Sequence, residues 1–146
     1  MERFLSMALR FQITPSVYLI LRRGEEILLM RRANTGHQDG NYSVVAGHIK
    51  KEETPTIAVI REALEEVGIS VKADDVKLVQ VVYRALDARV NFFFAVDTWK
   101  GEPYNKEEDK CDDVRWFPIK NLPGNMAPYV KKAIIHYFKG IPYMEY

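Results

Sequence analysis

Hydrophobic residues in the first third of the chain are grouped in short runs with polar turns between them. Residues 14–21 and 27–30 are rich in apolar and β-branched side chains, and the Arg-Gly-Glu sequence at 23–25 supplies a turn between the two runs. This pattern predicts a β-hairpin. A polar loop with glycines follows at 34–41, and residues 42–46 predict a third, short strand.

The second half of the chain also contains predicted strands, and these are followed by a predicted helix. Residues 76–83 and 90–96 predict two strands, and the three consecutive phenylalanines of the second indicate a strand that is covered on both faces. A polar loop at 100–113 leads to a short strand at 114–117 and an amphipathic helix at 127–138. The apolar residues of this helix are Val130, Ile134, Ile135 and Phe138. Strands alternating with helices predict a layered α/β fold.

The segment between Thr54 and Gly68 has the clearest helical pattern. Thr54 is a favourable N-cap, Pro55 favours the first helical turn, and Gly68 supplies a C-terminal cap. The apolar stripe predicted to face the core consists of Ile57, Ile60, Ala63, Leu64 and Val67.

Three carboxylates, Glu62, Glu65 and Glu66, lie on another face of this helix. Residues three and four apart are neighbours on a helix, and like charges at that spacing destabilise it by about a few tenths of a kcal/mol per pair. A hard divalent cation with oxygen ligands is a natural counter-charge. The alternative is that the acidic run is a solvated helix face. The capped helix and the loop before it favour a compact metal-binding unit.

The residues around this helix resemble the Nudix box of the Nudix hydrolase superfamily, and within it the MutT-type nucleotide pyrophosphohydrolases. The matching pattern is Gly47-x5-Glu53-x7-Arg61-Glu62-Ala63-x-Glu65-Glu66-x-Gly68-Ile69, in which only Ala63 is smaller than the bulky aliphatic residue often found there. The resemblance implies the Nudix fold, a mixed β-sheet sandwiched between α-helices, as a single domain over residues 1–146. It also implies hydrolysis of a nucleoside diphosphate linked to another moiety, with Mg²⁺ or, as an alternative, Mn²⁺.

The same resemblance implies roles for individual residues. Glu62, Glu65 and Glu66 are the expected metal ligands, joined by the backbone carbonyl of Ala46 or Gly47, where turn geometry is expected to matter more than the side chain. One of these glutamates, or a more distant one, is expected to activate the water. The catalytic residues implied by the resemblance are Glu53, Arg61, Glu62, Glu65, Glu66 and Glu107.

Two of these roles leave an alternative open. Glu53 is expected either to orient Arg61 or to contribute a ligand through solvent. Residues 99–107 resemble the corresponding stretch of MutT-type enzymes, in which Glu107 takes the position of a late metal-binding glutamate. The alternative for Glu107 is a solvated acidic loop.

Substrate-binding candidates come from the segments around the box. Arg32 leads into the loop before it, and a guanidinium suits phosphate oxygens, although a charge at a hairpin edge is the alternative. His48 follows Gly47 and is a candidate phosphate contact. It shares no zinc-ligand spacing with His37 or His136.

Several residues are candidates for contacting the base of a nucleotide. Tyr42, Trp116 and Phe117 are candidates for stacking on a base, with core packing as the alternative. Asn125 lies close to the position from which MutT-type enzymes read the base, slightly offset from it.

Charge and composition limit the partners. With 21 basic and 20 acidic residues the net charge is +1, which gives no electrostatic reason to expect nucleic acid or a membrane as a partner. A single cysteine, Cys111, excludes an internal disulfide and suits a reducing compartment. Because the chain has neither a signal peptide nor the ~20 apolar residues of a membrane span, we expect a cytoplasmic protein, as a monomer or homodimer.

The resemblance leaves several substrate classes to be ranked. A nucleoside triphosphate, cleaved to a monophosphate and pyrophosphate, ranks first because the chain is short and residues 99–107 are MutT-like. ADP-ribose and dinucleotides rank next. A non-catalytic nucleotide-binding Nudix sensor would be favoured by loss of the box acids, all of which are present, and a structural domain with a merely acidic helix ranks last.

Overall fold

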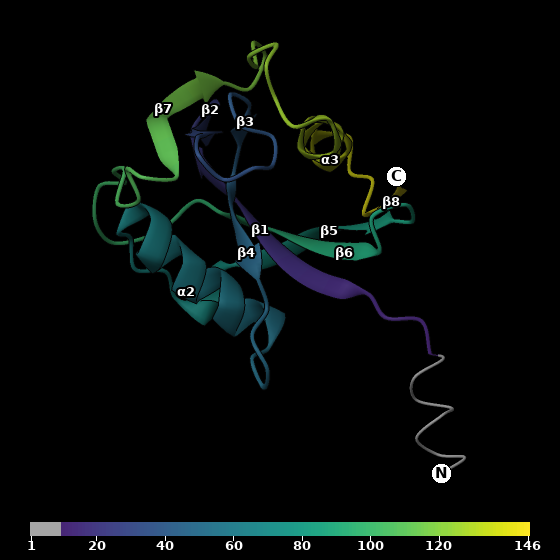
Figure 1. Ribbon diagram of the computed structural model, residues 1–146. Helices are drawn as coiled ribbons and strands as arrows, with labels where there is room; N and C mark the ends of the chain where they lie inside the picture. The colour runs from purple at the N-terminus through teal and green to yellow at the C-terminus, as the bar shows by residue number, and fades with distance from the viewer. Residues whose placement is uncertain (1–9) are drawn as a thin grey trace.

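The long strand β1 (Thr14–Arg23) runs through the middle of a mixed β-sheet, as seen in the computed structural model, which describes residues 10–146 (Figure 1). The other strands are β2 (Glu26–Arg32), β3 (Tyr42–Ser43), β4 (Val45–His48), β5 (Lys77–Arg84), β6 (Arg89–Val96), β7 (Cys111–Pro118) and β8 (Tyr143–Glu145). The helices are α2 (Pro55–Val67) and α3 (Pro128–Phe138), with a short 3₁₀ helix η1 (Ala73–Asp75).

The sheet has eight strands in mixed directions. Its main path is β3-β2-β1-β6-β5-β8, with β4 paired to β1 and β7 paired to β2. The β1–β6 and β5–β8 pairs are parallel, whereas β1 pairs antiparallel with both β2 and β4. The parallel β1–β6 pairing joins segments that are far apart in the sequence.

Each face of the sheet is covered by one helix (Figure 1). Side chains of β1 alternate between the two cores because successive residues of a strand point to opposite faces. Val17, Leu19 and Leu21 pack in the cluster that contains the buried residues of α2, and Tyr18 and Ile20 pack in the cluster under α3. The predicted α/β fold, a mixed sheet between helices, is confirmed.

The caps predicted for α2 are also confirmed. The Thr54 hydroxyl accepts a hydrogen bond from the backbone N–H of Ile57 at 3.2 Å. Gly68 has φ 71°, in the left-handed region, and its N–H donates to the carbonyl of Leu64.

The apolar stripe predicted for α2 was partly wrong. Ile57 and Leu64 are 54% and 48% exposed, whereas Ala58 and Val59 are fully buried. The buried row runs through positions four apart, from Val59 through Ala63 to Val67, and the small side chains at 58 and 63 let the helix lie close to the sheet.

Two other boundaries differ from the prediction. The strand predicted at 42–46 breaks at Val44 into β3 and β4, which pair with β2 and β1 respectively. The loop predicted at 100–113 is shorter, because β7 already begins at Cys111.

The C-terminal part of the chain also departs from the prediction. In α3, Ile135 and Phe138 lie toward solvent, while Tyr129 and Ala133 join the buried face. Strand β8, which pairs with β5, was not predicted, since only Met144 in it is buried. No helix within residues 10–146 is long and apolar enough to cross a membrane. Residues 1–9 of the predicted single domain lie outside the described part of the chain.

Candidate active site

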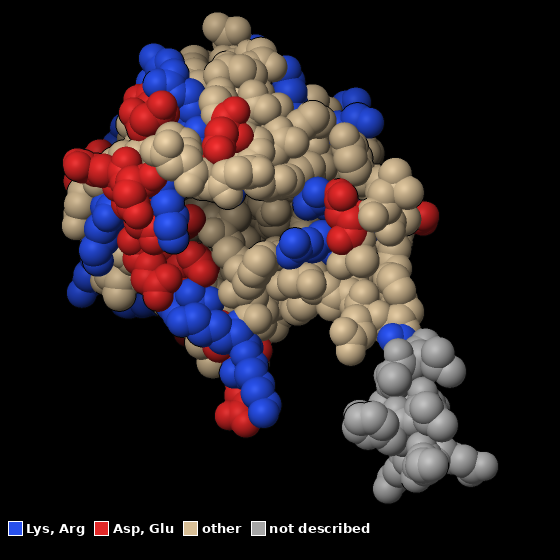
Figure 2. All heavy atoms as spheres, in the orientation of Figure 1, with Lys and Arg blue, Asp and Glu red and all other residues tan. Residues whose placement is uncertain are grey.

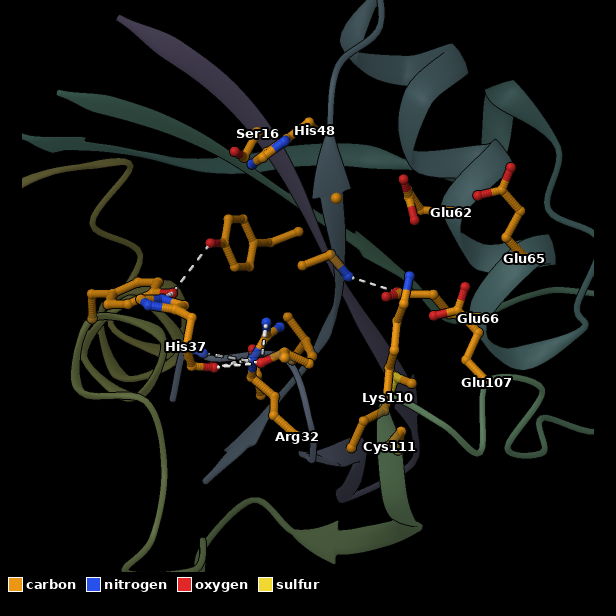
Figure 3. Close-up of a pocket in the computed structure, with 18 of the residues that line it drawn as sticks. Ser16, Arg32, His37, His48, Glu62, Glu65, Glu66, Glu107, Lys110 and Cys111 are labelled. Atoms are coloured by element: carbon orange, nitrogen blue, oxygen red, sulfur yellow. Dashed lines mark hydrogen bonds between the residues drawn. The ribbon is translucent and has the colours of Figure 1, made fainter. Parts of the chain in front are cut away.

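Four glutamates line one side of a cavity of about 580 Å³. Glu62, Glu65 and Glu66 come from α2, and Glu107 comes from the loop before β7 (Figure 3). In the space-filling view the acidic surface over α2 borders a hollow in the molecule (Figure 2). The structure therefore brings together the four carboxylates that the resemblance implied as metal ligands.

Arg61 ties the preceding loop to α2 behind these acids. Its guanidinium donates to both oxygens of Glu53, at 2.7 and 2.9 Å, and to the backbone carbonyl of His48 at 3.0 Å. It also donates to Glu62 at 2.7 Å and to Glu65 at 3.2 Å. Hydrogen bonding to Arg61 lowers the pKa of Glu53 to about 2. In the described part of the chain, Glu53 and Arg61 support the cavity wall without lining it.

Gly47 is needed because it approaches Glu62 closely. A Cβ atom at position 47 would lie 2.1 Å from Oε1 of Glu62 and 2.2 Å from its Cδ. Gly47 does not have a positive φ. The structure adds a steric reason for a glycine here, because the Glu62 carboxyl occupies the space that a side chain would fill.

Glu66 is held at the centre of the acidic side. One of its oxygens accepts a hydrogen bond from the backbone N–H of Ala46 at 2.9 Å. Burial raises the pKa of Glu66 well above its ordinary range, and the neighbouring Glu62 carboxyl raises it further. Burial also raises the pKa of Glu62, against the opposing effect of Arg61.

The C-terminal end of α2 fixes the segment that carries Glu107. The backbone N–H groups of Tyr104 and Lys106 donate to the carbonyls of Val67 and Glu66, at 3.1 and 3.2 Å. These bonds satisfy carbonyls that a helix end otherwise leaves without partners. They hold the loop against α2, so that Glu107 lies beside Glu66 along the cavity (Figure 3).

The donors on this side of the cavity fit a hard divalent cation by their chemistry. All four are carboxylates, the ligand type that Mg²⁺ and Mn²⁺ prefer. Within residues 10–146, however, no three His, Cys, Asp or Glu side chains meet closely enough to hold one ion. The Glu62 and Glu65 carboxylates both bond Nη1 of Arg61.

Arg32 and His48, the substrate-binding candidates beside the box, also line the cavity. Arg32 donates to the backbone carbonyl of His37 at 2.7 Å and to the Thr35 hydroxyl at 3.2 Å, which shapes the loop between β2 and β3. His48 lies at the end of β4, where its Nε2 is 2.9 Å from Nη1 of Arg89.

Tyr42 and Asn125 do not line this cavity. Tyr42 is only 2% exposed, its ring packs edge-on against Phe117, and its hydroxyl donates to Asp113. Core packing, the alternative, thus describes Tyr42, and Trp116 stacks on Trp99 away from the cavity. The Asn125 amide donates to the carbonyl of Gly40 at 3.0 Å and braces the loop before β3.

The sequence missed several residues of the cavity. The additional polar lining residues include Ser16, Tyr18, Thr35, His37, Arg84, Asp87, Arg89, Lys110 and Tyr129. The charged cluster in the Arg84–Arg89 turn was a visible signal, but hairpin turns are commonly charged. Only the pairing of β1 with both β4 and β6 brings this turn to the cavity.

Comparisons with known proteins agree with this fold. The family model described as "NUDIX domain" matches residues 12–138. The chain belongs to the Nudix family, whose hydrolases cleave phosphoanhydride bonds. It is 30% identical over 121 residues to the "8-oxo-dGTP diphosphatase" of Escherichia coli K12. This match covers 82% of this chain and 91% of that protein.

Two further comparisons extend the range of relatives. The chain is 32% identical over 117 residues to the "NAD-capped RNA hydrolase NudC" of Chromobacterium violaceum, and this match covers 80% of the chain but only 42% of that longer protein. A MutT Nudix hydrolase from Burkholderia pseudomallei superposes with a TM-score of 0.78 at 25% identity, covering 85% of this chain and 97% of that one.

Proposed function

We propose that this chain is a divalent-metal-dependent pyrophosphohydrolase that converts a nucleoside triphosphate to a monophosphate and pyrophosphate. The observation that carries the proposal is the convergence of Glu62, Glu65 and Glu66 with Glu107 on one side of a cavity of about 580 Å³. That volume lies within the ~300–1,000 Å³ typical of ligand pockets. Mg²⁺ is the proposed cofactor, with Mn²⁺ as an alternative.

The four glutamates would hold the metal, together with a backbone carbonyl of Ala46 or Gly47. When bound, a divalent metal polarises phosphoryl oxygens and lowers the pKa of a bound water. Arg61 ties α2 to the segment before it through three hydrogen bonds, two to Glu53 and one to the backbone carbonyl of His48. A pKa of about 2 makes the Glu53 carboxylate a weak base, and Arg61 donates to both of its oxygens, so its proposed role is to orient Arg61 rather than to accept a proton.

The triphosphate is favoured over other nucleotides by two observations. The relative named as an 8-oxo-dGTP diphosphatase matches over 91% of its own length. In addition, Glu107, in the MutT-like segment, lies beside the box acids. The relative named as an NAD-capped RNA hydrolase keeps a dinucleotide substrate as the second candidate, with ADP-ribose beside it. A non-catalytic sensor is the least supported, because every box acid is present.

The setting of this activity is part of the proposal. We take the substrate to be a free nucleotide rather than nucleic acid or a membrane component, in keeping with the net charge of +1. The cytoplasm is the proposed compartment, and a monomer or homodimer is the proposed active unit.

A panel of nucleotides incubated with Mg²⁺ and separated by chromatography tests this function. A nucleoside monophosphate and intact pyrophosphate are the expected products from the preferred substrate. AMP and ribose phosphate from ADP-ribose, or two mononucleotides from a dinucleotide, at a higher kcat/KM would replace the triphosphate by the second candidate. Absence of turnover for the whole panel would contradict the proposed function.

A further inference from the structure

The end of the cavity away from α2 is formed by the turn between β5 and β6. Arg84, Asp87 and Arg89 of this turn line the cavity together with His37 and His48, and we call these five residues the cationic end. Figure 2 has basic and acidic atoms across the hollow from the acidic surface of α2. The catalytic proposal uses the acidic side of the cavity and leaves this end without a role.

Arg84 is buried here with an unused hydrogen-bond donor. It is 7% exposed, its guanidinium lies 3.7 Å from the ring centre of Tyr129, and its Nη2 donates to Asp87 at 2.5 Å. Among the described residues its Nε has no hydrogen-bond partner, and this atom is buried from the cavity as well. Tyr129 and Asp87 therefore hold the positive charge of Arg84 in place at the cavity wall.

Arg89 brings a second positive charge that no carboxylate neutralises. Within residues 10–146 its only polar side-chain contact is with Nε2 of His48, at 2.9 Å. Because a guanidinium can only donate, this imidazole nitrogen is the acceptor. Among the described residues no Asp or Glu forms an ion pair with Arg89.

His37 reports the electrostatic potential at this end. Burial lowers its pKa, and the positive charges of Arg32, Arg84 and Arg89 lower it further, whereas Asp87 alone among its main neighbours acts in the opposite direction. Two guanidinium groups of this end, with Arg32 as a third near His37, outweigh the one carboxylate and make this end electropositive. An anion is therefore the favoured ligand.

Little aromatic surface is available here for stacking a base. The rings of Tyr18 and Tyr129 line the cavity but are only 7% and 6% exposed, because they pack against Phe93 and Arg84 respectively. The polar groups that remain accessible are guanidinium, imidazole and hydroxyl groups, which bind phosphate oxygens well.

We propose that the cationic end binds a phosphate group of the substrate other than the two that are joined by the cleaved bond. The proposal rests on the proposed function and adds a recognition element to it. Two sources share the required chemistry: the terminal phosphate of a nucleoside triphosphate, and a phosphate ester on the sugar. Arg89 and Arg84 would donate to its oxygens, and Asp87 would keep Arg84 oriented.

Steady-state kinetics with matched substrate pairs test this site. GTP and GDP differ by the terminal phosphate, and NADPH and NADH differ by a 2′-phosphate. We expect a kcat/KM preference for the phosphate-bearing member of one pair, which identifies the source. Arg89→Gln should reduce that preference by roughly tenfold or more, the scale of one charge-assisted hydrogen bond, and Arg89→Lys should retain part of it. Arg23→Gln, an exposed arginine outside the cavity, is the charge-matched control.

A binding measurement separates this proposal from the catalytic one. Calorimetric titration in excess chelator with AMP and with adenosine 2′,5′-bisphosphate, and with GDP and GTP, needs no turnover. A preference for the extra phosphate that Arg89→Gln removes supports the cationic end even if no nucleotide is hydrolysed. Equal affinities within both pairs, or an Arg89→Gln variant that keeps the wild-type preference, would overturn it.

Discussion

The contact between Gly47 and Glu62 makes one glycine a steric condition for the acidic cluster. In Gly47→Ala the new Cβ would have to displace the Glu62 carboxyl, from which it would be only 2.1 Å away. We expect kcat to fall by roughly tenfold to a hundredfold, the scale for a catalytic group displaced by about an ångström. The melting temperature should change little, because a flexible carboxyl can move.

Gly124→Ala is the matched control for this substitution. Position 124 has open space around it and no positive φ. Both variants should fold, and only the change at 47 should lower activity. Equal activities in the two variants would show that the position of the Glu62 carboxyl is not limiting.

Glu66 allows a second test at the residue scale. In Glu66→Gln the amide oxygen can still accept from the N–H of Ala46, while the negative charge beside Glu62 is removed. We expect kcat to fall by roughly a hundredfold or more and the melting temperature without metal to stay level or rise. A sharp fall in that melting temperature would identify Glu66 as structural.

Single residues also differ in how well the sequence predicted their positions. Glu62, Glu65 and Glu66 were predictable because helix geometry fixes their spacing. Tyr42 was not, because an aromatic residue at a strand start can face either the core or a cavity. Arg84 and Arg89 could not be assigned to the site either, because their position depends on which distant strands pair.

At the scale of elements, the hydrogen bonds from Arg61 to Glu53 fasten the loop after β4 to α2. Glu53 has a pKa of about 2, below its ordinary value of 4.5, because Arg61 donates to it. A depressed carboxyl pKa stabilises the fold above the ordinary value, and this contribution is lost as the pH falls toward the folded-state value. Wild-type stability should therefore decline between pH 4.5 and 2 more steeply than that of Glu53→Gln.

Denaturant unfolding at a series of pH values measures this difference. Glu25→Gln is a suitable control. Glu25 is exposed, and its ion pair with Arg22 on the surface is long, at 3.9 Å. If the stability of Glu53→Gln falls as steeply as that of the wild type over this range, the hydrogen bonds between Arg61 and Glu53 do not stabilise the loop.

The elements themselves were predicted to different degrees. The ends of α2 followed from Thr54, Pro55 and Gly68, whose effects are local. Which apolar residues of α2 are buried did not follow, because Ile57 and Leu64 lie on the border of a face that the sheet defines. The break of the predicted strand at Val44 did not follow from the sequence either. It depends on tertiary structure, because β3 and β4 pair with different strands.

For the whole molecule, a net charge of +1 conceals a separation of charge along one cavity. The acidic side belongs to α2 and the loop before β7, and the cationic end belongs to the β5–β6 turn. Composition sums these charges to nearly zero, so only the three-dimensional arrangement reveals the two ends.

This arrangement predicts that a divalent metal stabilises the folded protein as well as enabling the reaction. Glu62 and Glu66 have raised pKa values because they are buried, and the neighbouring carboxyls raise them further: Glu65 and Glu107 act on Glu62, and Glu62 and Glu107 act on Glu66. A cation that binds this folded cluster but not the unfolded chain should raise the melting temperature as its concentration increases. We expect Mg²⁺ to produce this rise in the wild type and a much smaller rise in Glu66→Gln. Excess chelator should abolish hydrolysis, and added Mg²⁺ should restore it. Full turnover in excess chelator, with a melting temperature that does not respond to Mg²⁺ or Mn²⁺, would contradict the assignment of the four glutamates as metal ligands.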